Sequence, residues 1–213
     1  MKKLKKEKTK INKSQLIEIG SFLIILLCAG AMFYQIYSNN KKDQLNDNLI
    51  QEYFEEEIQN NEVIEETEQV VEEQPVHVNY ENYIGVLEIK KINLKRGFYS
   101  KTSRNNNVNR NIQILNESDM PNIENGNVII AGHSGSSYVS FFRNLNKLDL
   151  YDEAIIYFEG KQYNYQLKNK YEIDKTGQAV IKRNKEKNVL TLITCKHNTN
   201  KQIVFIFELN EIK

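Results

Sequence analysis

Residues 189–195 read Val-Leu-Thr-Leu-Ile-Thr-Cys, and this stretch decides the fold. An apolar run of strand-forming residues ends in the thiol of Cys195. The polar residues 196–201 follow, and then a second apolar run covers residues 203–207. The pattern predicts two strands joined by a loop, with the thiol at the end of the first. The other cysteine, Cys28, lies in an apolar N-terminal segment, so Cys195 has no plausible disulfide partner.

A second strand with a reactive end lies upstream, where residues 127–135 read Asn-Val-Ile-Ile-Ala-Gly-His-Ser-Gly. Here the apolar run leads to His133, which has glycines on both sides. A cysteine at a strand end is more often a small core residue than a nucleophile. A thiol and an imidazole at two strand ends form a nucleophilic pair if the fold brings them together.

From residue 80 onward the chain consists of short β-type runs with turns between them. Residues 83–89 continue into 90–94, and further runs cover 112–115, 128–131, 154–158, 162–167 and 171–173. Residues 159–161 read as a hairpin turn, and residues 100–110 form a polar, Asn-rich loop. Apolar residues at helical spacing predict a short covering helix over residues 136–148. About eight short strands in this length predict a closed β-barrel or a sandwich.

The N-terminal part of the 213-residue chain predicts a membrane anchor. Residues 15–37 are mostly apolar, and about 20 such residues in a helix span the hydrocarbon core of a bilayer. The alternatives are a cleaved signal peptide and a buried helix, but large residues after Ala31 disfavour cleavage. Residues 1–14 form a basic tail with seven lysines, which places the N-terminus in the cytoplasm and the rest of the chain outside.

Residues 38–79 are expected to form an acidic linker, helical at first and then disordered, which ends near Pro75. Ten glutamates and no basic residue occur in residues 51–74. A loose helical stripe of apolar residues leaves a short dimerising coiled coil as the alternative. The stripe consists of Leu45, Leu49, Tyr53, Phe54 and Ile58. The catalytic domain is then predicted over residues 80–213.

Composition argues against several other classes of protein. The net charge is only +1, and the basic tail lacks the aromatic residues of a nucleic-acid-binding surface, so no nucleic acid is expected. The two cysteines and three histidines show no zinc-type spacing, and the glutamate-rich linker lacks loop-type calcium ligands. We therefore expect no metal and no cofactor.

At this point the residues carry a resemblance to a known family. Residues 191–195 match the Thr-Leu-x-Thr-Cys signature of the sortases, and Ala131-Gly132-His133 is similar to the histidine region of that family. Residues 84–92 resemble its opening strand pair, with Lys90 where many members have proline. The resemblance covers residues 83–209. It implies a mainly β fold, a closed eight-stranded sortase-type barrel with short helices, preceded by one transmembrane helix.

The resemblance also implies a function. Sortases are cysteine transpeptidases of Gram-positive cell surfaces that cleave an LPxTG-like sorting signal through a thioester and pass the acyl group to an amine. Cys195 would be the nucleophile, and His133 would favour the thiolate and move the protons. Thr194 would orient the substrate or help shape the pocket. The expected partners are surface proteins that carry the signal and an acceptor amine, from a peptidoglycan precursor or a pilin. The protein itself is expected to be a monomer in the cell membrane. The subclass stays open between class B and class D.

One position departs from the family pattern. Sortases carry an arginine at the start of the strand after the cysteine loop, where it stabilises the oxyanion. Here residues 200–204 read Asn-Lys-Gln-Ile-Val, so Lys201 is the nearest cation and Gln202 the nearest neutral donor. Lysine is a point charge without the planar fork of arginine, so the exchange is not conservative. We assign the role to Lys201 and keep Gln202 as the alternative.

Two other functions are compatible with the sequence. A tethered cysteine peptidase would let water resolve the thioester, whereas a catalytically weak or inactive barrel would only bind peptides; the missing arginine motivates the latter. Among the remaining candidates, His197 would compete with His133 for the role of base, and His77 is expected to be solvated. Arg143 is expected on the surface.

Overall fold

The computed structural model describes residues 13–66 and 82–213, in two compact units, Met1–Gln44 and Leu45–Lys213. Most of the predicted basic tail, the Pro75 boundary and His77 lie outside the described residues. One long helix, α1 (Lys13–Glu66), contributes to both units.

The first unit contains the apolar part of α1. Its large side chains, among them Phe22, Leu26 and Phe33, are more than half exposed. The most apolar window of the helix has a mean hydropathy of 2.0. By length and composition this segment could cross a membrane.

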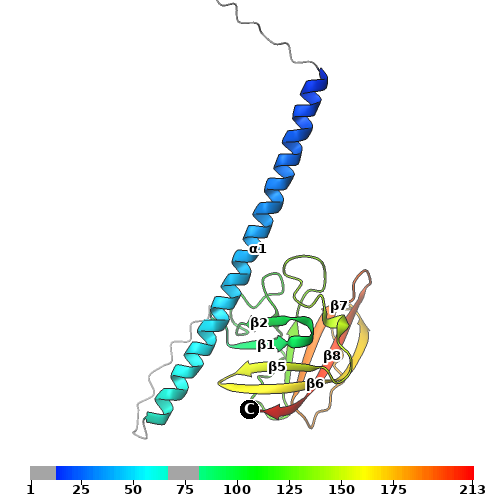
Figure 1. The fold of residues 1–213 in the computed structure, drawn as a ribbon. Helices are drawn as coiled ribbons and strands as arrows, with labels where there is room; N and C mark the ends of the chain where they lie inside the picture. The colour runs from blue at the N-terminus through cyan, green and yellow to red at the C-terminus, as the bar shows by residue number, and fades with distance from the viewer. Residues whose placement is uncertain (1–12, 67–81) are drawn as a thin grey trace, which may run out of the picture. The chain divides into compact units, whose positions relative to one another are not determined.

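The second unit is built on one eight-stranded sheet that curls into a nearly closed barrel (Figure 1). Its strands are β1 (Gly85–Ile89), β2 (Leu94–Phe98), β3 (Gln113–Ile114), β4 (Asn127–Ala131), β5 (Glu153–Phe158), β6 (Lys161–Asp174), β7 (Val189–Cys195) and β8 (Lys201–Ile212). They follow the order β2-β1-β5-β6-β8-β7-β4-β3. The predicted mainly β barrel is confirmed, and β2 and β3 are its edge strands.

Strand alternation divides the apolar residues between two cores. Leu190 and Leu192 of β7 belong to the large cluster inside the barrel, which also contains Phe98, Phe142 and Phe205. Val189 and Ile193 of the same strand point to the opposite face. There they form a second cluster with Ile129, Val204 and Ile206. Because successive side chains point to opposite faces, the face of each residue in β7 and β8 follows from its position.

The β5–β6 hairpin turns where it was predicted, at Glu159 and Gly160. Both residues have positive φ, 49° and 69°, as a two-residue hairpin turn requires. The following strand is longer than predicted, because β6 runs without a break from Lys161 to Asp174. Its pairing with β8 shifts register between Leu167 and Asn169, which accommodates the polar residues that separated the two predicted strands.

The covering helix predicted over residues 136–148 is wrong. The segment consists of turns and one 3-10 turn, η2 (Leu145–Lys147), although Phe142, Leu145 and Leu148 are buried in the barrel core. The Ser137 and Ser140 hydroxyls bond each other at 2.9 Å, and Arg143 donates to both of their carbonyl groups. These local bonds compete with the helical pattern, so apolar spacing alone misled the prediction.

The C-terminal part of α1 packs on the barrel, so the second unit begins at Leu45 instead of residue 80. Tyr53 of the predicted stripe and the nearby Ile50 are buried against Tyr83, Val86 and Tyr99. The Tyr83 hydroxyl also donates to the buried Asn46 amide oxygen at 3.1 Å. Of the stripe that suggested a dimer, Leu49, Tyr53 and Phe54 thus pack on the chain's own barrel.

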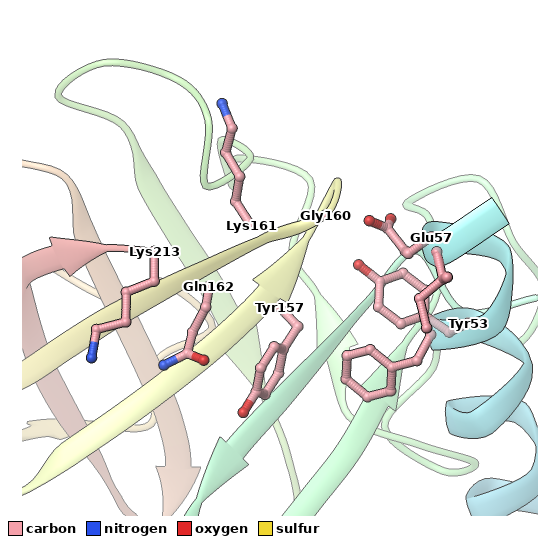
Figure 2. A pocket seen from close by; sticks show the side chains of 9 residues that line it. Tyr53, Glu57, Tyr157, Gly160, Lys161, Gln162 and Lys213 are labelled. Carbon is pink, nitrogen blue, oxygen red and sulfur yellow. The ribbon is translucent and has the colours of Figure 1, made fainter. Parts of the chain in front are cut away.

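A pocket of about 330 Å³ separates this part of α1 from the β5–β6 hairpin (Figure 2). The helix contributes Tyr53, Phe54, Glu57 and Ile58 to its lining, and Tyr157, Gly160, Lys161, Gln162 and Lys213 complete it. Figure 2 shows Tyr53 and Glu57 pointing toward the hairpin at Gly160. Partial burial there raises the pKa of the Glu57 carboxyl.

Candidate active site

The site is organised by the one parallel pairing described in the sheet, between β4 and β7. Ala131 lies beside Ile193 in this register, and the Gly132 amide donates to the Ile193 carbonyl at 3.1 Å. His133 and Cys195 each follow this last pair by two residues. The structure therefore brings the thiol and the imidazole, 62 residues apart in sequence, to neighbouring strand ends.

Two side-chain bonds hold these strand ends together. The Thr194 hydroxyl donates to the Gly132 carbonyl at 2.7 Å, and the Ser134 hydroxyl donates to the Cys195 carbonyl. Thr194 is only 4% exposed, and its hydroxyl makes this bond to the neighbouring strand. It belongs to the side chains that position the pair. Ser134 was not singled out from the sequence, where it looks like an ordinary loop residue.

A pocket of about 860 Å³ lies on the outer face of the same strands. Ile129 and Ala131 of β4, Ile193 of β7 and Gln202 of β8 line one side of it. Residues 177–181, from the segment between β6 and β7, line the other, and Glu117 and Lys175 add one charge of each sign. Cys195 follows Ile193 by two residues and so faces the side on which this pocket lies.

The same alternation separates Gln202 from Lys201. Gln202 is the direct partner of Cys195 in the antiparallel β7–β8 pairing, and directly paired residues share a face. Lys201, one residue earlier, therefore points to the opposite face. Of the two candidates for the place of the family arginine, the register puts Gln202 beside the thiol and Lys201 away from it.

Lys201 is engaged on that opposite face. Its ammonium lies 3.6 Å from Glu172 Oε2, while Lys196 bonds the other oxygen of the same carboxylate. The hydrogen bond from Lys196, aided by the charge of Lys201, lowers the pKa of Glu172. Glu172 thus joins the two ends of the loop that follows Cys195 through Lys196 and Lys201.

His133 has a partner that the sequence did not reveal. Its Nε2 lies 3.2 Å from the Oδ1 of Asn109, in the Asn-rich loop between β2 and β3. The only signal in the sequence was the density of asparagines, which is typical of turns. His197 is exposed on the loop after Cys195, and Arg143 bonds the carbonyl groups of its own turn.

No metal-binding cluster of three or more His, Cys, Asp or Glu residues occurs within residues 13–66 and 82–213. Both cysteines are free. The candidate groups at the two strand ends are a thiol, an imidazole and amides, which are types of side chain that can carry out nucleophilic acyl transfer.

Gly132 sets the path of the chain into His133, and this makes it sensitive to substitution. A Cβ there would lie 2.8 Å from the ring of Phe142, which is fully buried. Gly132→Ala is expected to lower the free energy of unfolding by about 1–3 kcal/mol through overpacking, measured by urea denaturation. In the control Gly135→Ala the added methyl meets only Ser140 Oγ, at 3.5 Å, and stability should not fall. Equal losses in both variants would contradict the argument.

Comparison with known proteins identifies the fold. The sortase domain family matches residues 87–209. No curated protein matches the chain. Among solved structures, the Clostridium perfringens sortase D5 transpeptidase is similar with a TM-score of 0.59 at 20% identity, over 78% of this chain and 98% of its own. The Streptococcus pneumoniae sortase C-3 matches with a TM-score of 0.54 at 20% identity, over 78% and 85%. The Listeria monocytogenes sortase A matches with a TM-score of 0.51 at 21% identity, over 62% of this chain and 89% of its own. More than half of the chain is thus matched by one domain family, and the chain belongs to the sortases.

Proposed function

We propose that this protein is a membrane-anchored cysteine transpeptidase that cleaves an LPxTG-like sorting signal and transfers the acyl group to a cell-wall or pilin amine. The observation that supports the proposal is the parallel β4–β7 pairing, because His133 and Cys195 each follow its last residue pair, Ala131 and Ile193, by two residues. The 860 Å³ pocket lined by Ile193 and Gln202 supplies room for a peptide on the same face of the sheet. The apolar part of α1 is the proposed anchor, and the lysines before it orient the N-terminus toward the cytoplasm.

The proposed reaction has two steps. In the first, the Cys195 thiolate attacks the carbonyl carbon of the sorting-signal threonine, and the peptide bond to glycine breaks. The His133 imidazolium gives its proton to the leaving amine, and a thioester remains on Cys195. In the second, the acceptor amine attacks the thioester and the neutral imidazole takes up the amine's proton. The sulfur departs as thiolate, so the enzyme is restored.

The negative oxygen that forms in each step needs a donor, and we assign this role to Gln202. The Gln202 amide shares the face of Cys195, whereas Lys201 is held by Glu172 on the other face. A preorganised neutral donor can stabilise an oxyanion in a site shielded from water. This proposal replaces our first assignment of Lys201.

Two substitutions separate these roles. Gln202→Ala is expected to lower the rate of acylation by about 10²-fold, the usual effect of removing one oxyanion donor. Lys201→Met removes an exposed, ion-paired charge and should change the rate by less than about twofold. Single-turnover acylation with a fluorogenic sorting-signal peptide measures both. A large loss in Lys201→Met with little change in Gln202→Ala would reverse the assignment.

The proposed function itself is tested on the full chain in detergent micelles. The chain is incubated with a panel of LPxTG-like peptides, and intact-mass spectrometry looks for an acyl adduct. An adduct that an added amine carries off as a ligated peptide supports transpeptidation. Release only as the free acid, even with amine present, would indicate a peptidase. A chain that forms no adduct and whose thiol resists alkylation would instead be a peptide-binding barrel.

A further inference from the structure

The Asn-rich segment, residues 105–111, is tied to both edge strands of the barrel. Asn106 is 9% exposed; it donates to the Ile114 carbonyl at 2.9 Å and accepts from the Ile114 amide at 2.8 Å, on β3. Asn111 is 2% exposed; it donates to the Gly97 carbonyl at 2.8 Å and accepts from Arg96 Nε at 2.6 Å, on β2. Each pair of hydrogen bonds satisfies buried polar groups that are costly to leave unpaired. Both ends of the segment are therefore fixed.

The backbone between these ties is also fixed. The Asn107 side chain accepts from the amide of Asn109 at 2.9 Å, which is the bond of an Asx turn. The Asn107 carbonyl accepts from the amides of Arg110 at 2.9 Å and Asn111 at 2.8 Å. Asn109 therefore projects from a braced turn, and its Oδ1 lies 3.2 Å from His133 Nε2.

We infer that Asn109 is the positioning residue of His133, an inference that rests on the proposed function. An amide oxygen can only accept, so the contact requires a proton on Nε2. Asn109 then holds the neutral imidazole as the Nε2–H tautomer, and it also accepts from the imidazolium. Because Nε2 is occupied, Nδ1 is the nitrogen that gives the proton to the leaving amine and takes one from the acceptor amine. At many histidine sites the hydrogen bond made by one ring nitrogen decides in this way which tautomer is present and so what the other nitrogen can do.

Two independent readouts on the full chain in micelles test this role. Nitrogen NMR with ¹⁵N-histidine reports the tautomer, and His133→Gln identifies the resonances among the three histidines. In the native chain we expect neutral His133 to carry its proton on Nε2. Asn109→Ala should give a mixture of tautomers and lower kcat about tenfold with little change in KM, as expected for loss of orientation alone.

Matched variants complete the design. Asn109→Asp keeps an acceptor oxygen, so it should retain the Nε2–H tautomer and recover part of kcat. Asn105→Ala removes an amide of the same segment that bonds Arg110 and not His133, so it should leave both readouts unchanged. An Nδ1–H tautomer in the native chain would overturn the inference. A fall in kcat in Asn109→Ala without a change of tautomer would do the same. If the native chain shows no turnover, the proposed function fails, while the NMR readout still decides whether Asn109 orients the ring.

Discussion

Replacing Cys195 by alanine is expected to abolish the acyl adduct and to reduce peptide cleavage by about 10⁴-fold or more, as the loss of a covalent nucleophile does. No other described group is placed to take over its role, because the neighbouring Thr194 hydroxyl is buried and bonded to the Gly132 carbonyl. The thiol is partly exposed and lies outside the barrel core, so the fold should survive the change. Intact mass after incubation with peptide and the initial rate of cleavage measure the effect.

Cys28→Ala is the matched control for this prediction. It removes the only other thiol of the chain, which is exposed on the apolar part of α1. That variant should form the adduct and cleave peptide at the native rate. An adduct that persists in Cys195→Ala, or that disappears in Cys28→Ala, would show that the thioester forms elsewhere. An unfolded Cys195→Ala variant would show as a loss of the cooperative thermal transition, so a folding defect is distinguishable from a chemical one.

The reactive strand ends could be predicted from the sequence because each is a local pattern. An apolar run followed at once by Cys195 or His133 is visible within a few residues. Their proximity was not visible, because it depends on a parallel pairing between segments about 60 residues apart. No turn fixes the register of such a pair, and no short-range signal reports it. The resemblance to a family supplied that step.

The choice between Lys201 and Gln202 could not be made from the sequence either, because it depends on strand register. From composition the cation was the obvious candidate, since it is adjacent to the expected position. A shift of one residue in a strand turns a side chain to the other face, so the role depends on register and not on charge. Only the pairing of Cys195 with Gln202, and the carboxylate of Glu172 on the other face, distinguish the two.

The packing of the second half of α1 on the barrel was hidden from the sequence for a different reason. The acidic residues 51–74 have the composition of a solvated linker, and this outweighed a weak apolar stripe. In the structure, Tyr53 of that stripe and the nearby Ile50 are 6% exposed each and pack against Val86 of β1. Glutamates on the exposed side of a helix do not prevent its apolar side from packing, so composition averaged over the segment concealed the contact.

This packing makes Tyr53 the residue of α1 whose loss should cost most. Tyr53→Ala removes a buried ring that packs edge-on against Phe54, at 5.3 Å between centroids, and belongs to the cluster around Tyr83 and Val86. We expect the free energy of unfolding of the barrel to fall by about 3 kcal/mol. This value is at the lower end of the range for losing a large buried side chain, because Tyr53 borders a pocket. Urea denaturation followed by tyrosine fluorescence measures the change.

Glu55→Ala provides the comparison on the same helical turn. Glu55 is exposed and accepts a hydrogen bond from Gln51 at 2.8 Å, so its loss should change stability by less than about 0.5 kcal/mol. If α1 were only a spacer between the anchor and the barrel, the two variants would be equally stable. A difference confined to Tyr53→Ala would mean that the barrel is complete only with residues from Leu45 onward. In that case the helix that leaves the proposed anchor is itself part of the catalytic domain.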